Sequence, residues 1–178
     1  IIEKRVSFDA EFSVILARDA GGNIDYWDCP RNNHADGILS QSTLPAGPLV
    51  ESQIAAARTL AAAIADTLGY IGVMTCEFFA TQSAPVFNEM APRVHNSGHW
   101  TIEGAMTSQF ENHIRAICGL PLGDSRTVYG RVEMENLIGD DILKWERIMA
   151  DPAAHIHIYG KGAPRPGRKM GHVTRLYP

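Results

Sequence analysis

The 178-residue sequence predicts an α+β protein, in which an antiparallel sheet flanked by helices is followed by a smaller, mainly β part. Three observations favour this class. Strand-like segments separated by short turns occupy the first thirty residues and residues 70–91, as in antiparallel hairpins. Two helical segments with clear start and end signals lie between strands. The character of the chain changes near residue 124, which predicts two domains, residues 1–124 and residues 125–178.

The composition is that of an ordinary globular protein, with 45% hydrophobic and 20% charged residues. A net charge of -4 argues against a nucleic-acid-binding protein, whose affinity would need a broad basic face. The three cysteines form no C-x-x-C pair, so they indicate neither a disulfide framework nor a zinc site, and they fit a reducing cytoplasm. No apolar run approaches the ~20 residues of a membrane span. Neither nucleic acid nor a membrane is an expected partner.

The first part of the chain is expected to form an antiparallel meander, with strands over residues 1–6, 11–18 and 24–29. Residues 30–48 lack periodicity and are long for a simple connection, so we expect a functional loop that contains His34. The sequence begins in what reads as the middle of a strand, without an initiator Met. We therefore interpret it as a fragment of a longer chain.

Two amphipathic helices are expected. Apolar residues recur at helical spacing over residues 51–68, and Gly69 is placed as the C-terminal cap. The second helix begins at Ser108, which forms a capping box with Glu111 three residues later. The side chains expected to form its buried stripe are Phe110, Ile114 and Ile117.

The expected hairpin over residues 70–91 carries two carboxylates, Glu77 and Glu89, and it is the most informative part of the sequence. If the hairpin is centred on Ser83, these carboxylates face each other, and like charges in that position repel. A cation should lie between them, and Mg²⁺ is the economical choice because one or two carboxylates plus water and substrate phosphates complete its shell. The alternative is a register off by one, which leaves a carboxylate solvated or paired with Arg93. The same register pairs Thr81 with Pro85 and Phe79 with Phe87.

Two further polar segments supply candidate contacts. After the hairpin, Arg93, His95 and Asn96 offer hydrogen-bond donors to an anionic substrate or a developing oxyanion. Near the C-terminus, the loop GKGAPRPGRKMG combines glycines, which let backbone N–H groups approach an anion, with basic side chains such as Lys161 and Arg168. A phosphate monoester is the natural ligand of this loop. The alternative is an ordinary solvated basic turn.

These segments resemble a known family. The run NEMAPRVHNSGHWTIEGAMTSQFENHIRAICGLPLG is similar to 5-(carboxyamino)imidazole ribonucleotide synthases, the ATP-grasp carboxylases of microbial purine biosynthesis, and so are NNHADGIL and YGKGAPRPGRKMGH. The resemblance covers essentially the whole chain and implies an ATP-grasp large subdomain followed by a small C-terminal β domain. It also implies ATP-dependent carboxylation of 5-aminoimidazole ribonucleotide by bicarbonate through carboxyphosphate. ATP and two Mg²⁺ ions would be the cofactors, in a cytoplasmic homodimer.

The resemblance assigns roles to individual residues. It implies that Glu77 and Glu89 bind Mg²⁺, and that Lys161 and Arg168 bind the 5′-phosphate of the ribonucleotide. The implied pocket for bicarbonate and carboxyphosphate consists of Arg93, His95 and Asn96. The implied ATP-binding residues are Glu3, Lys4, Arg5, Val6, Glu11, His34, Asn88 and Glu89.

Two departures from the family pattern matter. ATP-grasp enzymes commonly show Glu-x-Asn at the second metal position, whereas Glu89 is followed at that spacing by Ala91. The family's N-terminal domain and its lid do not precede Ile1, so we expect this segment to be inactive alone. The alternatives are another ATP-grasp carboxylase, a formyl-transferring purine ligase, and a noncatalytic nucleotide-binding or dimerisation module.

Overall fold

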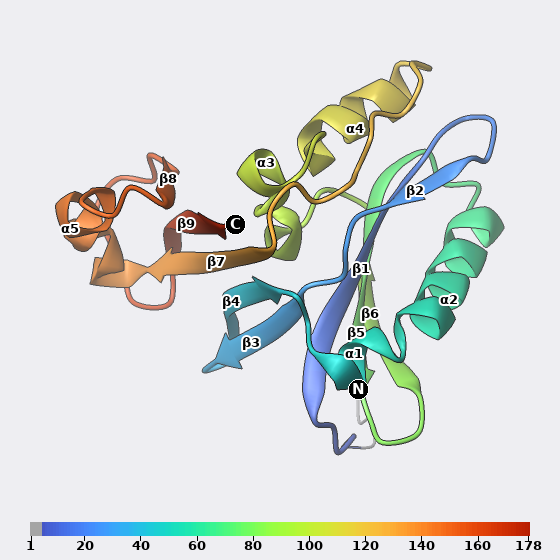
Figure 1. Ribbon diagram of the computed structural model, residues 1–178, viewed down its shortest axis with the longest axis horizontal. Helices are drawn as coiled ribbons and strands as arrows, with labels where there is room; N and C mark the ends of the chain where they lie inside the picture. The colour runs from blue at the N-terminus through green and yellow to red at the C-terminus, as the bar shows by residue number, and fades with distance from the viewer. Residues whose placement is uncertain (1–4) are drawn as a thin grey trace.

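The structure is a computed structural model that describes residues 5–178 (Figure 1). One antiparallel sheet runs through it in the order β6-β5-β1-β3-β4-β7-β9-β8, with β2 paired to β1. The strands are β1 (Ala10–Arg18), β2 (Ile24–Tyr26), β3 (Arg31–Ala35), β4 (Ile38–Leu44), β5 (Gly72–Ala80), β6 (Pro85–Ala91), β7 (Arg131–Ile138), β8 (Ala154–Ile158) and β9 (Lys169–Tyr177). The helices are α1 (Pro48–Glu51), α2 (Ile54–Thr67), α3 (Thr101–Gly104), α4 (Gln109–Ile117) and α5 (Trp145–Met149), with 3₁₀ turns η1 (Asn96–Gly98) and η2 (Gly139–Lys144). The predicted α+β class is confirmed.

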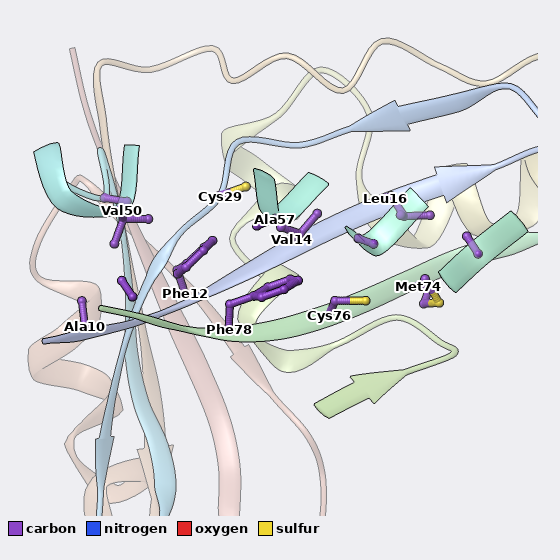
Figure 2. Close-up of a cluster of buried hydrophobic side chains, with 14 residues drawn as sticks. Ala10, Phe12, Val14, Leu16, Cys29, Val50, Ala57, Met74, Cys76 and Phe78 are labelled. Carbon is purple, nitrogen blue, oxygen red and sulfur yellow. The ribbon is translucent and has the colours of Figure 1, made fainter. Parts of the chain in front are cut away.

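One face of the sheet is covered by α2, which lies alongside β1 and β5 (Figure 1). The helix predicted over residues 51–68 is therefore present, and the residues that it buries, Ala57, Ala61 and Ala65, are small enough for close packing on the strands. Gly69 follows it at φ 56°, as expected of a C-terminal cap. Alternate residues of β1 and β5 fill this core (Figure 2): Phe12, Val14, Leu16, Met74, Cys76 and Phe78.

Most of the segment predicted to be a loop is instead the β3–β4 hairpin, so the prediction of a loop is wrong, while its functional role stays a prediction. The two strands meet at Asp36 and Gly37, both with positive φ (51° and 73°), a conformation that Gly and Asp tolerate well. Strand β3 carries no large apolar residue, because its buried side chain, Asn32, contacts polar side chains on both neighbouring strands. Strand β3 therefore lacks the alternation of apolar and polar residues by which a strand is predicted.

The start of the predicted meander is shorter than expected. Of residues 1–6, only Arg5 and Val6 are described, and they lie outside any strand; the rest of that prediction falls outside the described residues. Strand β2 ends at Tyr26, three residues before the predicted end.

The second helix, α4, begins as predicted but presents the opposite face to the protein. Ser108 accepts a hydrogen bond from the backbone N of Glu111. The predicted buried stripe of Phe110, Ile114 and Ile117 is 40%, 54% and 52% exposed, so that prediction is wrong. The inward residues are instead Gln109, Asn112 and Ala116, of which the two amides hydrogen-bond the flanking loops.

The C-terminal part continues the same sheet. Strand β4 pairs with β7 from Gln41↔Glu135 to Leu44↔Val132, so hydrogen bonds cross from residues before position 124 to residues after it. A second core lies on the face opposite α2, where Ile15 and Val73 pack with Trp27, Trp100 and Met134. The division into domains at residue 124 stays a prediction. Within residues 5–178, none of the helices is long and apolar enough to cross a membrane.

Candidate functional site

The β5–β6 hairpin places its two carboxylates opposite each other, as predicted. The structure pairs Glu77 with Glu89, Cys76 with Met90 and Phe78 with Phe87. One extra residue, Asn88, therefore stands between the pairs Glu77–Glu89 and Phe78–Phe87 as a β-bulge. Because of this bulge, the predicted pairs Phe79 with Phe87 and Thr81 with Pro85 are wrong, while the pair nearer the base of the hairpin is correct.

The bulge changes which side chains share a face. Regular alternation would put Phe87 and Glu89 on the same side of β6. Instead, Phe87 and Met90 line an apolar groove with α2, whereas Glu89 lines a polar cleft with Glu77. The inserted residue therefore places Glu89 in the same cleft as Glu77.

The polar cleft, which has a volume of about 530 Å³, brings the paired carboxylates and the basic loop together. Sequence analysis identified these as two separate signals, and they belong to elements more than seventy residues apart. The cleft is lined by His34, Gly37, Ile38, Leu39, Glu77, Glu89, His95, Lys161, Gly167, Arg168 and Lys169.

The electrostatics of Glu77 fit a cation site. Burial raises the pKa of its carboxyl, the neighbouring charge of Glu89 raises it further, and His34 and Lys169 oppose that rise. A divalent cation would relieve both unfavourable effects, because it offsets the lost hydration and the like-charge repulsion. Within the described residues, no group of three or more His, Cys, Asp or Glu side chains is arranged to hold a metal. Two carboxylates suit Mg²⁺ that completes its shell with phosphate and water.

Two of the residues expected to bind ATP lie side by side next to this cleft. Nδ1 of His34 on β3 contacts Oε2 of Glu11 on β1. The antiparallel pairing of β1 and β3 brings them together. Of the remaining expected ATP-binding residues, Arg5 and Asn88 are exposed and Val6 is half-buried, whereas Glu3 and Lys4 lie outside the described residues.

The residues expected to bind bicarbonate differ in their surroundings. His95 is half-buried, with Nε2 3.5 Å from Glu77 Oε1, and burial together with the charges of Arg93 and Lys169 lowers its pKa to about 4. Its imidazole is therefore neutral at physiological pH. Arg93 is exposed and donates to the backbone O of Val94 (2.9 Å). It does not line the cleft, although its charge affects His95.

Asn96 is fixed by a reciprocal amide pair. Its Nδ2 donates to Asn136 Oδ1 (2.8 Å), and Asn136 Nδ2 donates back to Asn96 Oδ1 (2.6 Å). Asn136 lies on β7 and also donates to the backbone O of Leu39 (2.9 Å), so three segments meet at this pair. The C-terminal part of the chain therefore positions a residue of the candidate site.

Lys169 is a site residue that sequence analysis did not single out. It begins β9, lines the cleft, and donates from Nζ to Asn96 Oδ1 (2.9 Å). Burial lowers the pKa of its ammonium, and the charge of Glu77 opposes that shift. Lys169 is thus a half-buried cation that interacts with both the amide pair and the carboxylate of Glu77. In the sequence it is one of four basic residues of the loop GKGAPRPGRKMG, with Lys161, Arg165 and Arg168.

Gln109 is a second residue near the site for which the sequence predicted no role. Its Oε1 accepts from the backbone N of His95 (2.9 Å), and its Nε2 donates to the backbone O of the same residue (2.7 Å). A Cβ on Gly98 would lie 2.6 Å from Gln109 Oε1, so this contact requires glycine there. Only the capping box one residue earlier hinted at this position.

The basic loop is ordered by its own side chains. Lys161 Nζ donates to the backbone O of Lys169 (2.9 Å), and Arg168 donates to the backbone O of Lys161 (3.3 Å). Gly160, Gly162 and Gly167 all have positive φ, which allows the tight path of the loop. Lys161 and Arg168 are thus held in an ordered loop that lines the cleft.

Comparison with known proteins gives consistent results for both parts of the chain. The family model of the ATP-grasp domain matches residues 1–110, and that of the phosphoribosylaminoimidazole carboxylase C-terminal domain matches residues 133–178. The chain is 50% identical to N5-carboxyaminoimidazole ribonucleotide synthase of Brucella melitensis over 100% of its own length and 49% of that protein. It is 43% identical to the protein of that name from Bacillus subtilis, over 98% of this chain and 46% of that protein.

Solved structures agree with these relatives. The N5-carboxyaminoimidazole ribonucleotide synthetase of Thermus thermophilus matches 97% of this chain and 47% of its own, with a TM-score of 0.89 and 44% identity. The Aspergillus clavatus synthase, solved with ADP and 5-aminoimidazole ribonucleotide, matches 96% of this chain and 48% of its own, with a TM-score of 0.87 and 34% identity. The chain spans about half the length of the curated relatives it matches.

Proposed function

The chain belongs to the ATP-grasp family, and from that premise we propose that it supplies much of the active site of an ATP-dependent ligase. The reaction is the carboxylation of 5-aminoimidazole ribonucleotide by bicarbonate, with ADP and phosphate as the other products. The observation that carries the proposal is that paired carboxylates and phosphate-suited cations line one cleft. The relatives named for this activity support the choice of substrate.

In this proposal the two ends of the cleft bind different phosphates. Glu77 and Glu89 hold one or two Mg²⁺ ions, which would neutralise the ATP phosphates during transfer to bicarbonate. Glu11, His34 and Asn88 contact the nucleotide beside them, together with the segment of Glu3, Lys4, Arg5 and Val6.

The acceptor chemistry is proposed to fall to His95, which lines the cleft, and to its neighbours Arg93 and Asn96. The neutral imidazole of His95 is proposed to donate a hydrogen bond to an anionic oxygen of the substrate. The side-chain amide of Asn96, which its pair with Asn136 holds in place, is proposed to donate to the same anion. Arg93 is proposed to reach the carboxyphosphate from the rim. The amine of the ribonucleotide then attacks the activated carboxyl group.

Lys161 and Arg168 are proposed to bind the 5′-phosphate of the ribonucleotide. We expect Arg168→Ala to raise the KM for the ribonucleotide by roughly tenfold or more, because a charge-assisted hydrogen bond is lost. The KM for ATP should change less than twofold. Steady-state kinetics with each substrate varied in turn would measure both. Arg165→Ala is the matched control, because Arg165 is exposed in the same loop but does not line the cleft. Equal increases in both KM values would contradict this division of roles.

The isolated 178-residue chain is proposed to be inactive, because its relatives are about twice as long. We expect no ribonucleotide-dependent ATP hydrolysis by this chain alone, and measurable activity from a full-length protein that contains it. A coupled ADP assay on both proteins at equal concentration makes the comparison. Turnover by the short chain would show that the described residues suffice.

A homodimer in the cytoplasm completes the proposal, as the family resemblance implies. Sedimentation equilibrium of the full-length protein tests the assembly. A panel of amine acceptors tests the substrate against the alternatives of another ATP-grasp carboxylase or a formyl-transferring ligase. Binding of ATP without hydrolysis and without turnover of any acceptor would favour a noncatalytic module.

A further inference from the structure

Lys161, one of the two residues proposed to bind the 5′-phosphate, lies against an aromatic ring. Its Nζ is 4.9 Å from the centroid of the Tyr159 ring. The face of such a ring carries partial negative charge, so it attracts a cation that lies within about 6 Å of its centroid. Gly160 and Gly162, on either side of the lysine, have positive φ (63° and 75°), a conformation that glycine adopts at little cost. They allow the loop to turn so that Lys161 lies over the ring of a residue only two positions earlier.

The ammonium of Lys161 lies among other cations. Its charge contributes to the lowered pKa of Lys169, so these two cations repel each other, and Arg168 lines the same cleft. Lys161 is also exposed, and a flexible exposed lysine loses conformational entropy when it is fixed. Repulsion and entropy therefore both favour an ammonium that points into solvent, away from the cleft. The ring of Tyr159 supplies an attraction that opposes them.

The ring of Tyr159 is itself held by strand β9. The backbone N of Tyr159 donates to the backbone O of Met170 (2.9 Å), and its hydroxyl is 2.8 Å from Nδ1 of His172, which is 2% exposed. The rings of Tyr159 and His172 also pack together, with their centroids 5.7 Å apart. Burial lowers the pKa of His172 to about 3, so its imidazole is neutral and does not repel the lysine. The ring that contacts Lys161 thus has a fixed position.

The contacts of the Lys161 ammonium leave donors for a ligand. An ammonium has three N–H donors, and one of them is used in the bond to the backbone O of Lys169 (2.9 Å). The aromatic face attracts the charge as a whole and does not require a conventional hydrogen bond. Lys161 can therefore be held by the ring and the backbone and still donate to a phosphate oxygen in the cleft that it lines.

We propose that Tyr159 is a positioning residue for the ribonucleotide, because its ring holds the Lys161 ammonium where that cation binds the 5′-phosphate. The inference rests on the proposed function, since it takes Lys161 to be a ligand of that phosphate. A cation that is already in place loses less entropy when the phosphate binds, so the contribution of the ring appears in the affinity for the ribonucleotide. The hydroxyl of Tyr159 serves the fold instead, through its contact with His172.

The test compares Tyr159→Leu with Tyr159→Phe in a full-length protein that contains this chain. Leu removes the aromatic face, whereas Phe keeps that face and removes only the hydroxyl. We expect Tyr159→Leu to raise the KM for the ribonucleotide about two- to fivefold, as for an exposed cation–π contact, and Tyr159→Phe to stay near wild type. In both variants kcat and the KM for ATP should change less than about twofold. The Tm should fall in both, because His172 loses the hydroxyl.

Tyr177→Leu is the matched control. Cζ of Arg131 lies 5.3 Å from the centroid of the Tyr177 ring, and neither residue lines the cleft, so this variant removes a contact of the same kind elsewhere. Both KM values should stay at wild type. In a protein that already carries Lys161→Met, Tyr159→Leu should raise the KM for the ribonucleotide no further. The inference would be overturned by an equal rise in that background, by equal rises in Tyr159→Leu and Tyr159→Phe, or by no rise in Tyr159→Leu.

Proton NMR of protein labelled with carbon-13 lysine reads the contact without substrate, and Lys161 is assigned by the loss of its signals in Lys161→Met. Protons above the face of an aromatic ring are shifted upfield. We expect upfield ε-methylene protons for Lys161 in the wild type and in Tyr159→Phe, and ordinary shifts in Tyr159→Leu. Ordinary shifts in the wild type would overturn the inference even if Tyr159→Leu fails to fold. Wild-type protein with upfield protons but no turnover of the ribonucleotide would refute the proposed function alone.

Discussion

Glu89→Gln and Glu77→Gln are each expected to lower kcat by roughly 10²- to 10³-fold in a full-length protein, with little change in fold. Each substitution keeps the shape of the side chain and removes one negative charge from the proposed metal site. The loss should appear in Mg²⁺-dependent ATP turnover and should not be recovered by more ribonucleotide. Steady-state kinetics over a range of Mg²⁺ concentrations measures it.

Stability should respond in the opposite direction. The two carboxylates face each other across the hairpin, and their repulsion helps to raise the pKa of Glu77. Removing one charge relieves that repulsion, so both variants should have a Tm equal to or above that of wild type in the absence of Mg²⁺ and ATP. Adding Mg²⁺ and ATP should stabilise the wild type more than either variant. Calorimetry with and without ligand tests this.

Glu146→Gln is the matched control, because Glu146 is exposed on α5 and should leave kcat and both Tm values unchanged. Near-normal turnover of Glu89→Gln would refute the metal assignment. A Tm well below wild type without ligand would instead mean that the carboxylates serve the fold.

The pairing of these carboxylates could be predicted from the sequence, although for a partly mistaken reason. A symmetric hairpin centred on Ser83 gives the correct Glu77–Glu89 pair and the wrong Phe79–Phe87 pair. The strands next to the turn pair about a centre between Gln82 and Ser83, not about Ser83 itself. The residue inserted at Asn88 compensates for this difference, so the predicted pairing is correct at the carboxylates. Nothing in a period-two pattern marks such an insertion, since Phe87 and Glu89 are spaced as if they shared a face.

Other parts of the fold were hidden because polar residues occupy inward positions. Strand β3 lacks apolar alternation, and its buried side chain, Asn32, hydrogen-bonds Ser13 and Ser42 on the neighbouring strands. Helix α4 turns Gln109 inward for His95 and leaves Ile114 exposed. In both cases the mistaken expectation was that burial follows hydrophobicity, and the side chains that break the rule hold the candidate site together. Such contacts depend on tertiary structure and leave no local pattern.

Lys169→Met is expected to lower kcat by roughly 10²-fold, while the KM for the ribonucleotide changes only slightly. The basic loop appeared in the sequence as one cluster, but the structure separates its members. All three cations line the cleft, but Lys161 and Arg168 donate to backbone oxygens of the loop, whereas Lys169 donates to Asn96 Oδ1 and its charge acts on Glu77. Met keeps the length of the side chain and removes the charge and the donor.

Lys169→Met removes the charge of Lys169 while it keeps most of the side chain's volume, so it should reveal two effects of that charge. It lowers the pKa of Glu77, so its loss should let Glu77 hold a proton to higher pH and move the acid limb of the kcat profile upward. It also holds Asn96, whose amide pair with Asn136 would then be fixed by two hydrogen bonds without the cation. Lys161→Met is the matched control, because it should raise the KM for the ribonucleotide and leave the acid limb in place. Identical profiles for the two variants would show that the loop acts as a single phosphate site, with no separate part for Lys169 in the transfer step.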